Sequence, residues 1–255
     1  MRKVQPPSTA ADGLGGGEER VGQEAGITES EVSLRGADGA AVPCYVAEPA
    51  GATHAAGVVI APELFGLSAW IRSCARRLAE FGFRAAAVEV FARDPLPDPE
   101  RAPLPVLMER MQRLSWLGAL DDLRAGAAHL RARGASKTGC LGFCMGGTLA
   151  QLYSADPIAA VVDCYGRIRH AADPLVAIRR GRCPVLGIYG ARDTGIPLSD
   201  VEDLRRALAH RPGSEVHVFD AGHAFLNDHR PQHHDSEQAA LAWAKIEGFL
   251  LRNLG

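Results

Sequence analysis

The chain has 255 residues, of which 47 % are hydrophobic and 23 % are charged, and its formal net charge is −2. This composition is ordinary for a folded globular protein and far from that of disordered chains. It provides no basic surface for nucleic acid or anionic lipid, so we expect a small-molecule partner and neither a nucleic-acid nor a membrane partner.

The first 28 residues do not predict a packed structure. They are rich in Gly, Glu, Ala and Pro, and cannot bury enough apolar surface to offset the entropy of ordering. We therefore expect a flexible tail over 1–28 and a single folded domain over 29–255. The N-terminus lacks the apolar segment of a secretory signal, and no run approaches the ~18 apolar residues of a membrane span. With the six cysteines expected to be reduced, these features indicate a cytoplasmic protein.

From residue 29 onward, strand and helix patterns alternate. Two runs at 30–35 and 40–47 flank the turn pair Asp38-Gly39 and predict an antiparallel hairpin. Short continuous apolar runs then follow, which is typical of parallel strands covered by helices on both faces. These runs span 56–61, 85–90, 138–143, 159–166 and 184–190, and a last strand is expected at 216–219.

Helical spacing of apolar residues separates the strand patterns. The predicted helices cover 68–82, about 116–133, a segment starting at Cys144, 199–210 and about 236–253. Ser68 is a candidate N-cap of the first. The alternation predicts an α/β fold with a mostly parallel, doubly wound sheet, an N-terminal hairpin and helices on both faces. In such a sheet the reactive groups gather on loops at the carboxyl ends of the strands.

The segment GCLGFCMGGT at 139–148 has the pattern of a nucleophile elbow, a sharp strand-to-helix turn with Cys144 at its tip. Gly142 and Gly146 stand where a Cβ would clash in such a turn. The helix N-terminus beside Cys144 favours the reactive thiolate, and the Met145 N–H is the expected donor to an oxyanion. The alternative is a glycine-rich turn that holds an inert buried cysteine.

Two further candidate residues follow later strands. Asp193 comes after the run at 184–190, and His223 comes after the run at 216–219. Together with Cys144 they follow the order of nucleophile, acid and base in hydrolases of this fold. His223 would take the thiol proton and later activate water, while Asp193 would orient the imidazole.

Other polar clusters predict no chemistry. His229, His233 and His234 crowd a polar stretch that no helix or strand organises, so we expect a solvated loop and no metal site. Asp121 and Asp122 are expected on a solvated helix face. No cofactor is expected.

With these residues the sequence resembles the dienelactone hydrolase family, which has the α/β-hydrolase fold, over about residues 30–253. Four segments carry the resemblance: PELFGL at 62–67, FAR at 91–93, GFCMGG at 142–147 and AGHAF at 221–225. The resemblance implies a carboxymethylenebutenolidase-like hydrolase of carboxylic esters or lactones. It also implies that Cys144, Asp193 and His223 form the catalytic triad.

The resemblance implies roles for five more positions. Glu63 falls where the family has a glutamate that contacts the nucleophile and helps to activate it. Leu64 falls where a backbone N–H is the second oxyanion donor. Arg93 matches an arginine at the substrate site, where it could pair with Glu63 or with a substrate carboxylate. Family members that cleave dienelactone carry a tyrosine in place of Phe91 and a second arginine in place of Asn227.

These two differences remove a hydroxyl and a positive charge expected to help hold a substrate carboxylate, and Arg230 is a candidate replacement for the charge. The expected activity is ester or lactone hydrolysis through a thioester acyl-enzyme. The alternatives are a thioesterase or peptidase with the same triad, and a catalytically inactive fold that binds a small molecule. We expect a monomer or a weak homodimer.

Overall fold

The structure is a computed structural model that describes residues 19–24, 26–51 and 55–255. Its strands are β1 (Glu19–Glu24), β2 (Ile27–Arg35), β3 (Ala41–Pro49), β4 (Gly57–Ala61), β5 (Arg84–Val88), β6 (Thr138–Phe143), β7 (Ala160–Cys164), β8 (Val185–Gly190) and β9 (Glu215–Phe219). Its helices are α1 (Ala69–Glu80), α2 (Leu104–Arg113), α3 (Trp116–Ala132), α4 (Met145–Tyr153), α5 (Pro174–Arg180), α6 (Leu198–Leu208) and α7 (Ser236–Leu254).

The described strands form one sheet in the order β1-β2-β3-β5-β4-β6-β7-β8-β9. Pairing is antiparallel from β1 to β5 and parallel from β5 to β9. All residues of β4 to β8 are buried, as expected for strands that are rich in apolar residues and covered on both faces. The parallel strands therefore end together at one edge of the sheet, and the loops there can share a site.

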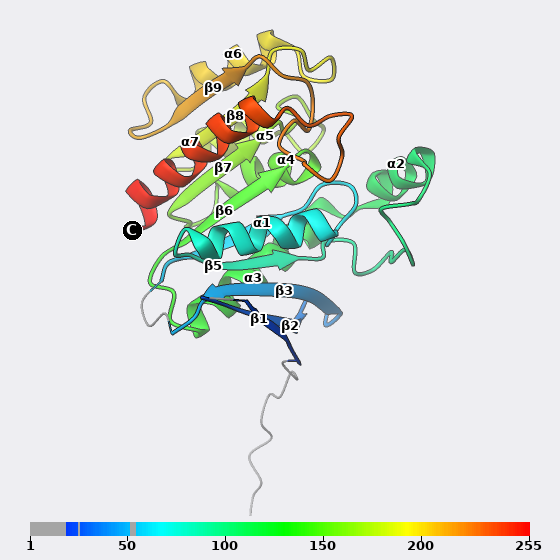
Figure 1. The fold of residues 1–255 in the computed structure, drawn as a ribbon. Helices are drawn as coiled ribbons and strands as arrows, with labels where there is room; N and C mark the ends of the chain where they lie inside the picture. The colour runs from blue at the N-terminus through cyan, green and yellow to red at the C-terminus, as the bar shows by residue number, and fades with distance from the viewer. Residues whose placement is uncertain (1–18, 25, 52–54) are drawn as a thin grey trace, which may run out of the picture.

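Helices cover both faces of this sheet. Helices α1 and α7 lie on the face turned to the viewer in Figure 1, where α1 packs on β3 and β5 and α7 packs on β6 to β8. On the other face α3, α4, α5 and α6 pack side by side. Helix α2 stands apart from both layers, beyond the carboxyl ends of the parallel strands (Figure 1).

The predicted α/β-hydrolase arrangement is confirmed. The hairpin appears as β2 and β3, and Gly39 adopts a φ of +85° in its turn, which glycine reaches without steric cost. Ser68 caps α1, because its side chain accepts a hydrogen bond from the Ile71 N–H at 3.3 Å. No helix within the described ranges is long and apolar enough to cross a membrane.

The structure also contains three elements that the sequence patterns did not predict, namely β1, α2 and α5. Strand β1 pairs with β2 and lies inside the predicted tail, so the tail boundary at residue 28 differs from the structure. Residues 1–18 of that predicted tail lie outside the described residues.

Candidate active site

Cys144 lies at the turn between β6 and α4, with φ 53° and ψ −116°. Residues with a Cβ rarely adopt this backbone conformation, and strain of this kind is concentrated at functional sites. A Cβ at Gly142 would lie 1.9 Å from the Gly146 carbonyl oxygen, and one at Gly146 would lie 2.0 Å from the Ala61 carbonyl oxygen. Backbone atoms cannot move aside as a flexible side chain can. The turn predicted at 139–148 is therefore present, and it needs both glycines.

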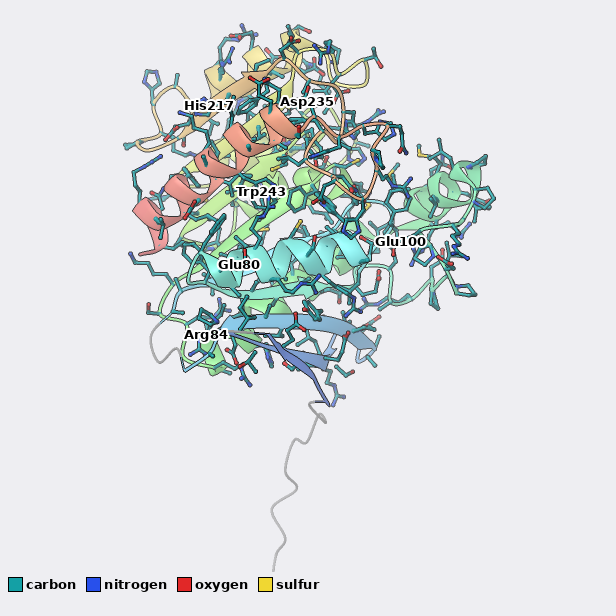
Figure 2. The ribbon with its side chains drawn as sticks, in the orientation of Figure 1. Glu80, Arg84, Glu100, His217, Asp235 and Trp243 are labelled. Atoms are coloured by element: carbon teal, nitrogen blue, oxygen red, sulfur yellow. The ribbon has the colours of Figure 1, made fainter. Side chains whose placement is uncertain are left out.

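The residue before Cys144 fixes the turn from below. Phe143 is fully buried, and its ring lies 4.6 Å from Trp70 and 6.1 Å from Trp243. Trp243 lies between α7 and α1 in Figure 2. Because both helices hold Phe143 through aromatic contacts, the position of the Cys144 side chain is set by the packed core.

His223 joins Cys144 to Asp193 across the carboxyl ends of β6, β8 and β9. Its Nε2 lies 3.1 Å from Cys144 Sγ, and its Nδ1 lies 2.6 Å from Asp193 Oδ2. The second oxygen of Asp193 accepts a hydrogen bond from the Gly195 N–H at 2.8 Å, which fixes the carboxylate plane. The structure therefore brings together the three residues predicted to act as nucleophile, base and acid.

The environment of His223 favours its charged form. Burial opposes protonation, but the hydrogen bonds to Asp193 and Cys144 outweigh it and raise the pKa of His223 to about 10. The ring of Tyr165 packs with its edge toward the imidazole at a centroid distance of 5.2 Å, and Tyr165 itself has a φ of 46°. An imidazolium beside Cys144 Sγ is an arrangement that stabilises a thiolate.

Glu63 follows β4 and is only 2 % exposed. Burial raises the pKa of its carboxyl to about 7, although the hydrogen bond from Asn227 and the charge of Arg230 act in the other direction. Asn227 Nδ2 donates to Glu63 Oε1 at 2.9 Å. Asn227 was expected at the substrate, but in the structure it holds Glu63.

Two backbone N–H groups lie beside Cys144. Leu64 and Met145 both line the space in front of it. Within the part of the chain that the structure describes, neither N–H donates to a protein acceptor. Free amides at a helix N-terminus and in a tight loop are suited to hold an oxyanion.

Cys144, His223 and Leu64 line two pockets. The first, the α2–α3 pocket, has a volume of about 320 Å³, within the range of small-molecule sites. Its other lining residues include Met108, Met111, Trp116, Tyr165 and Ile196. The second, the Arg230 pocket, has a volume of about 280 Å³, and its other lining residues include Glu63, Phe65, Leu104, Leu107 and Arg230.

Arg93 does not line either pocket, contrary to the expectation from its match to a substrate-site arginine. Its guanidinium donates to Asp38 at 2.8 and 3.0 Å and also to Asp122. Phe91 is likewise absent from both pockets and is 2 % exposed, with the Arg110 guanidinium 4.0 Å above its ring. Because Asp122 is fully buried, its carboxylate needs a cation, and Arg93 provides it.

The position of Asp122 also corrects the prediction for the Asp121-Asp122 pair. Asp121 lies on the outer face of α3 and pairs with Arg124 at 2.6 Å, as a solvated carboxylate would. Asp122 is fully buried instead. Burial raises the pKa of the Asp122 carboxyl, against the effect of Arg93.

The loop after β9 contains Arg230 and the three clustered histidines, His229, His233 and His234. The Arg230 guanidinium lies 3.7 Å above the ring of Phe65, at the wall of the Arg230 pocket. His233 lines the same pocket. His234 Nδ1 contacts the Phe225 carbonyl oxygen at 3.0 Å, and the His229 N–H donates to Asn227 Oδ1 at 3.0 Å.

Across the described ranges, no group of three or more His, Cys, Asp or Glu residues is arranged to hold a metal ion.

The sequence reasoning missed several pocket residues. Tyr165 could have been found, because it follows β7 at the same edge of the sheet as the other candidates. Met108 and Met111 lie on α2, a helix that the predicted elements omit although its apolar residues have helical spacing. Their contribution to the pocket depends on where the tertiary fold places α2.

The chain is similar to known proteins over most of its length. The family model described as the dienelactone hydrolase family matches residues 42–254. A Salmonella typhimurium protein named "putative carboxymethylenebutenolidase" is 34 % identical over 240 residues, which cover 87 % of this chain and 85 % of that protein. An Escherichia coli K12 protein of the same name is 33 % identical over 226 residues, covering 81 % and 83 % of the two chains.

Solved structures are similar in fold as well. The crystal structure of a Klebsiella pneumoniae protein named "putative dienelactone hydrolase" has a TM-score of 0.81 and 31 % identity, and the match covers 88 % of this chain and 98 % of that one. A dienelactone hydrolase-like promiscuous phosphotriesterase from metagenomic libraries has a TM-score of 0.72 and 23 % identity, over 91 % and 100 % of the two chains. At that identity the second match supports the fold alone.

Proposed function

Because the chain belongs to the dienelactone hydrolase family, we propose that it hydrolyses a carboxylic ester or lactone through a thioester formed on Cys144. One observation carries the proposal: His223 Nε2 lies 3.1 Å from Cys144 Sγ while its Nδ1 lies 2.6 Å from Asp193. A nucleophile within hydrogen-bond reach of a base that a third group orients is the arrangement required for acyl transfer.

The acylation half-reaction begins from the charged pair. The raised pKa of His223 favours its protonated ring near neutral pH, and an imidazolium at this position stabilises the thiolate that attacks the carbonyl. The attack forms the C–S bond and moves the carbonyl electrons onto oxygen, where the N–H groups of Leu64 and Met145 stabilise the oxyanion. Collapse of this intermediate breaks the ester C–O bond. The imidazolium gives its proton to the leaving oxygen.

The deacylation half-reaction then uses the neutral imidazole. His223 removes a proton from a water molecule as the water oxygen attacks the thioester carbonyl. The second tetrahedral intermediate expels the Cys144 thiolate, which again pairs with the imidazolium. The products are the carboxylic acid and the alcohol, or the hydroxy acid when the substrate is a lactone. Asp193 stabilises the imidazolium throughout.

Glu63 is proposed to govern the charge beside the sulfur. Its carboxyl lines the Arg230 pocket together with Cys144, and its pKa of about 7 makes it close to half protonated at neutral pH. A neutral Glu63 does not repel the thiolate. An ionised Glu63 stabilises the imidazolium but competes with the thiolate for a proton.

Substitution of the nucleophile tests the proposal. Cys144→Ala should reduce the turnover of methyl or aryl acetates to the background rate without unfolding the protein, because the side chain is only partly buried and lines both pockets. Cys183→Ala removes a buried thiol away from both pockets and should keep wild-type turnover. Full activity in the Cys144→Ala variant would rule out the assignment.

A substrate panel separates ester hydrolysis from related chemistry at the same triad. Aryl esters, lactones, acyl thioesters and a peptide amide should be compared by kcat/KM. We expect esters or lactones to be the best substrates. A preference of more than about tenfold for thioesters or for the peptide would assign the chain to another reaction class.

A further inference from the structure

Two pockets meet at Cys144. Cys144 and His223 line the α2–α3 pocket and the Arg230 pocket alike. The reacting carbonyl carbon must lie within reach of the sulfur, at the junction of the two. The two groups on either side of that carbonyl, the acyl group and the alcohol, can therefore each occupy a different pocket.

Helix α2 contributes side chains to both pockets. Leu104 and Leu107 line the Arg230 pocket, and Met108 and Met111 line the α2–α3 pocket. Residues three apart lie on one face of a helix. The two pairs therefore form two neighbouring faces of α2, and one short helix borders both arms of the substrate.

Helix α2 is held to the rest of the molecule by few buried side chains. Its buried residues are Leu107 and Arg110, and Arg110 Nε donates to the Asp94 carbonyl oxygen at 2.7 Å. Figure 1 shows α2 projecting beyond the sheet. In the segment that leads to it, the Glu100 carboxylate, labelled in Figure 2, accepts a hydrogen bond from the Ala69 N–H at 3.2 Å. Both methionines of α2 line the α2–α3 pocket, and Met111 also packs against the edge of the hydrophobic core.

The wall opposite α2 combines apolar side chains with one cation, Arg167. Trp116 and Ile196 line it, and the ring of Trp116 lies 4.2 Å from that of His170. Burial lowers the pKa of His170, and the charge of Arg167 lowers it further, so the imidazole is neutral near pH 7. Methionine adapts its shape to an apolar ligand more readily than branched residues do.

Resting on the proposed function, we infer that the substrate carries a bulky apolar group, aryl or medium-chain alkyl, that fills the α2–α3 pocket. Met111 is then a specificity-determining residue, because it lies on the pocket side of α2. A small group at this position would leave the methionine and indole surfaces exposed to water. Each buried methylene of a substrate should raise kcat/KM about fourfold until the pocket is filled.

Two ester series with one shared member test this inference. Methyl acetate is compared with methyl hexanoate, which enlarges the acyl group, and with benzyl acetate, which enlarges the alcohol. The wild type should prefer at least one of the larger esters by about tenfold or more. The series that shows the preference identifies the arm that occupies the α2–α3 pocket.

The variant Met111→Asp should remove that preference, measured as the ratio of kcat/KM for the preferred larger ester to kcat/KM for methyl acetate. Val106→Asp is the matched control, because Val106 is exposed on the same helix and lines neither pocket. Met111→Leu should keep the preference. The inference is overturned if neither series discriminates, or if the two aspartate variants behave alike. An enzyme that turns over none of these esters would instead contradict the proposed function.

Discussion

At the scale of single residues, Arg93 does not lie where the sequence resemblance places it. Sequence resemblance places an arginine there at the substrate, whereas in the structure its guanidinium spans Asp38 and the buried Asp122. The Asp38 contact lowers the pKa of the Asp38 carboxyl. Arg93 is thus a structural cation that joins the hairpin turn to helix α3, and no arginine at this position is left to bind a carboxylate at Cys144.

Arg93→Met should therefore destabilise the fold more than it affects catalysis. It leaves the Asp122 carboxylate buried without its partner, which costs about 2 kcal/mol; a fully buried pair would cost more, but Arg93 is partly exposed. Urea unfolding measures the change. Arg113→Met is the control, because its partner Asp94 lies at the surface, and the expected cost is at most about 1 kcal/mol. An unchanged stability with a raised KM would place Arg93 at the substrate.

At the scale of elements, the strand–turn–helix unit of β6 and α4 depends on close backbone approach. Gly146→Ala would put a Cβ 2.0 Å from the Ala61 carbonyl oxygen on the neighbouring strand β4. We expect a loss of about 3 kcal/mol in the free energy of unfolding, because strand and turn would have to separate. Gly222→Ala adds a Cβ with no atom within 4 Å, so its stability should change by less than about 0.5 kcal/mol. Equal effects of the two would refute the steric account of the turn.

The elements differ in how far the sequence predicts them. The buried parallel strands β4 to β8 are visible as apolar runs, because helices cover both of their faces. The turn at Cys144 is visible as well, because only glycine fits beside it. Helix α2 has an apolar stripe at helical spacing, formed by Leu104, Leu107, Met108 and Met111, and the prediction overlooked it. Its role at the site depends on its position in the tertiary fold.

The residues of the candidate site also differ in how far the sequence predicts their positions. Cys144, Asp193 and His223 follow strand ends, and chain order alone groups these residues, whose side chains lie within hydrogen-bond distance in the structure. Asp122 and Arg93 are both charged, and their burial as a pair depends on the packing of α3 against the hairpin. Asn227 likewise reads as a lost substrate contact in the sequence, and only coordinates reveal its hydrogen bond to Glu63.

At the scale of the whole molecule, Glu63 makes folding stability depend on pH. Burial raises its pKa from 4.5 to about 7 in the folded protein, and unfolding returns it to the ordinary value. Between these two pH values the folded state binds more protons than the unfolded state. The free energy of unfolding contributed by Glu63 therefore falls as pH rises through this window, by about 3 kcal/mol in total.

Glu63→Gln removes this dependence. Urea titration from below pH 4.5 to above pH 7 measures the unfolding free energy of both proteins. As pH rises, the wild type should become less stable relative to the variant. Glu80→Gln, on the exposed side of α1 (Figure 2), should follow the wild-type profile. A pH-independent difference for Glu63→Gln would mean that the carboxyl is ionised in the folded protein throughout.

The central claim is that the acyl group of the substrate passes through Cys144. The most direct measurement is mass spectrometry of the wild-type enzyme, quenched in acid within the first turnovers of an aryl acetate and then digested. The account predicts one added acetyl group on the peptide that contains Cys144, lost again as the substrate is exhausted. Rapid product formation with an unmodified Cys144 at every time point, or an acetyl group on another residue that turns over at the catalytic rate, would contradict it.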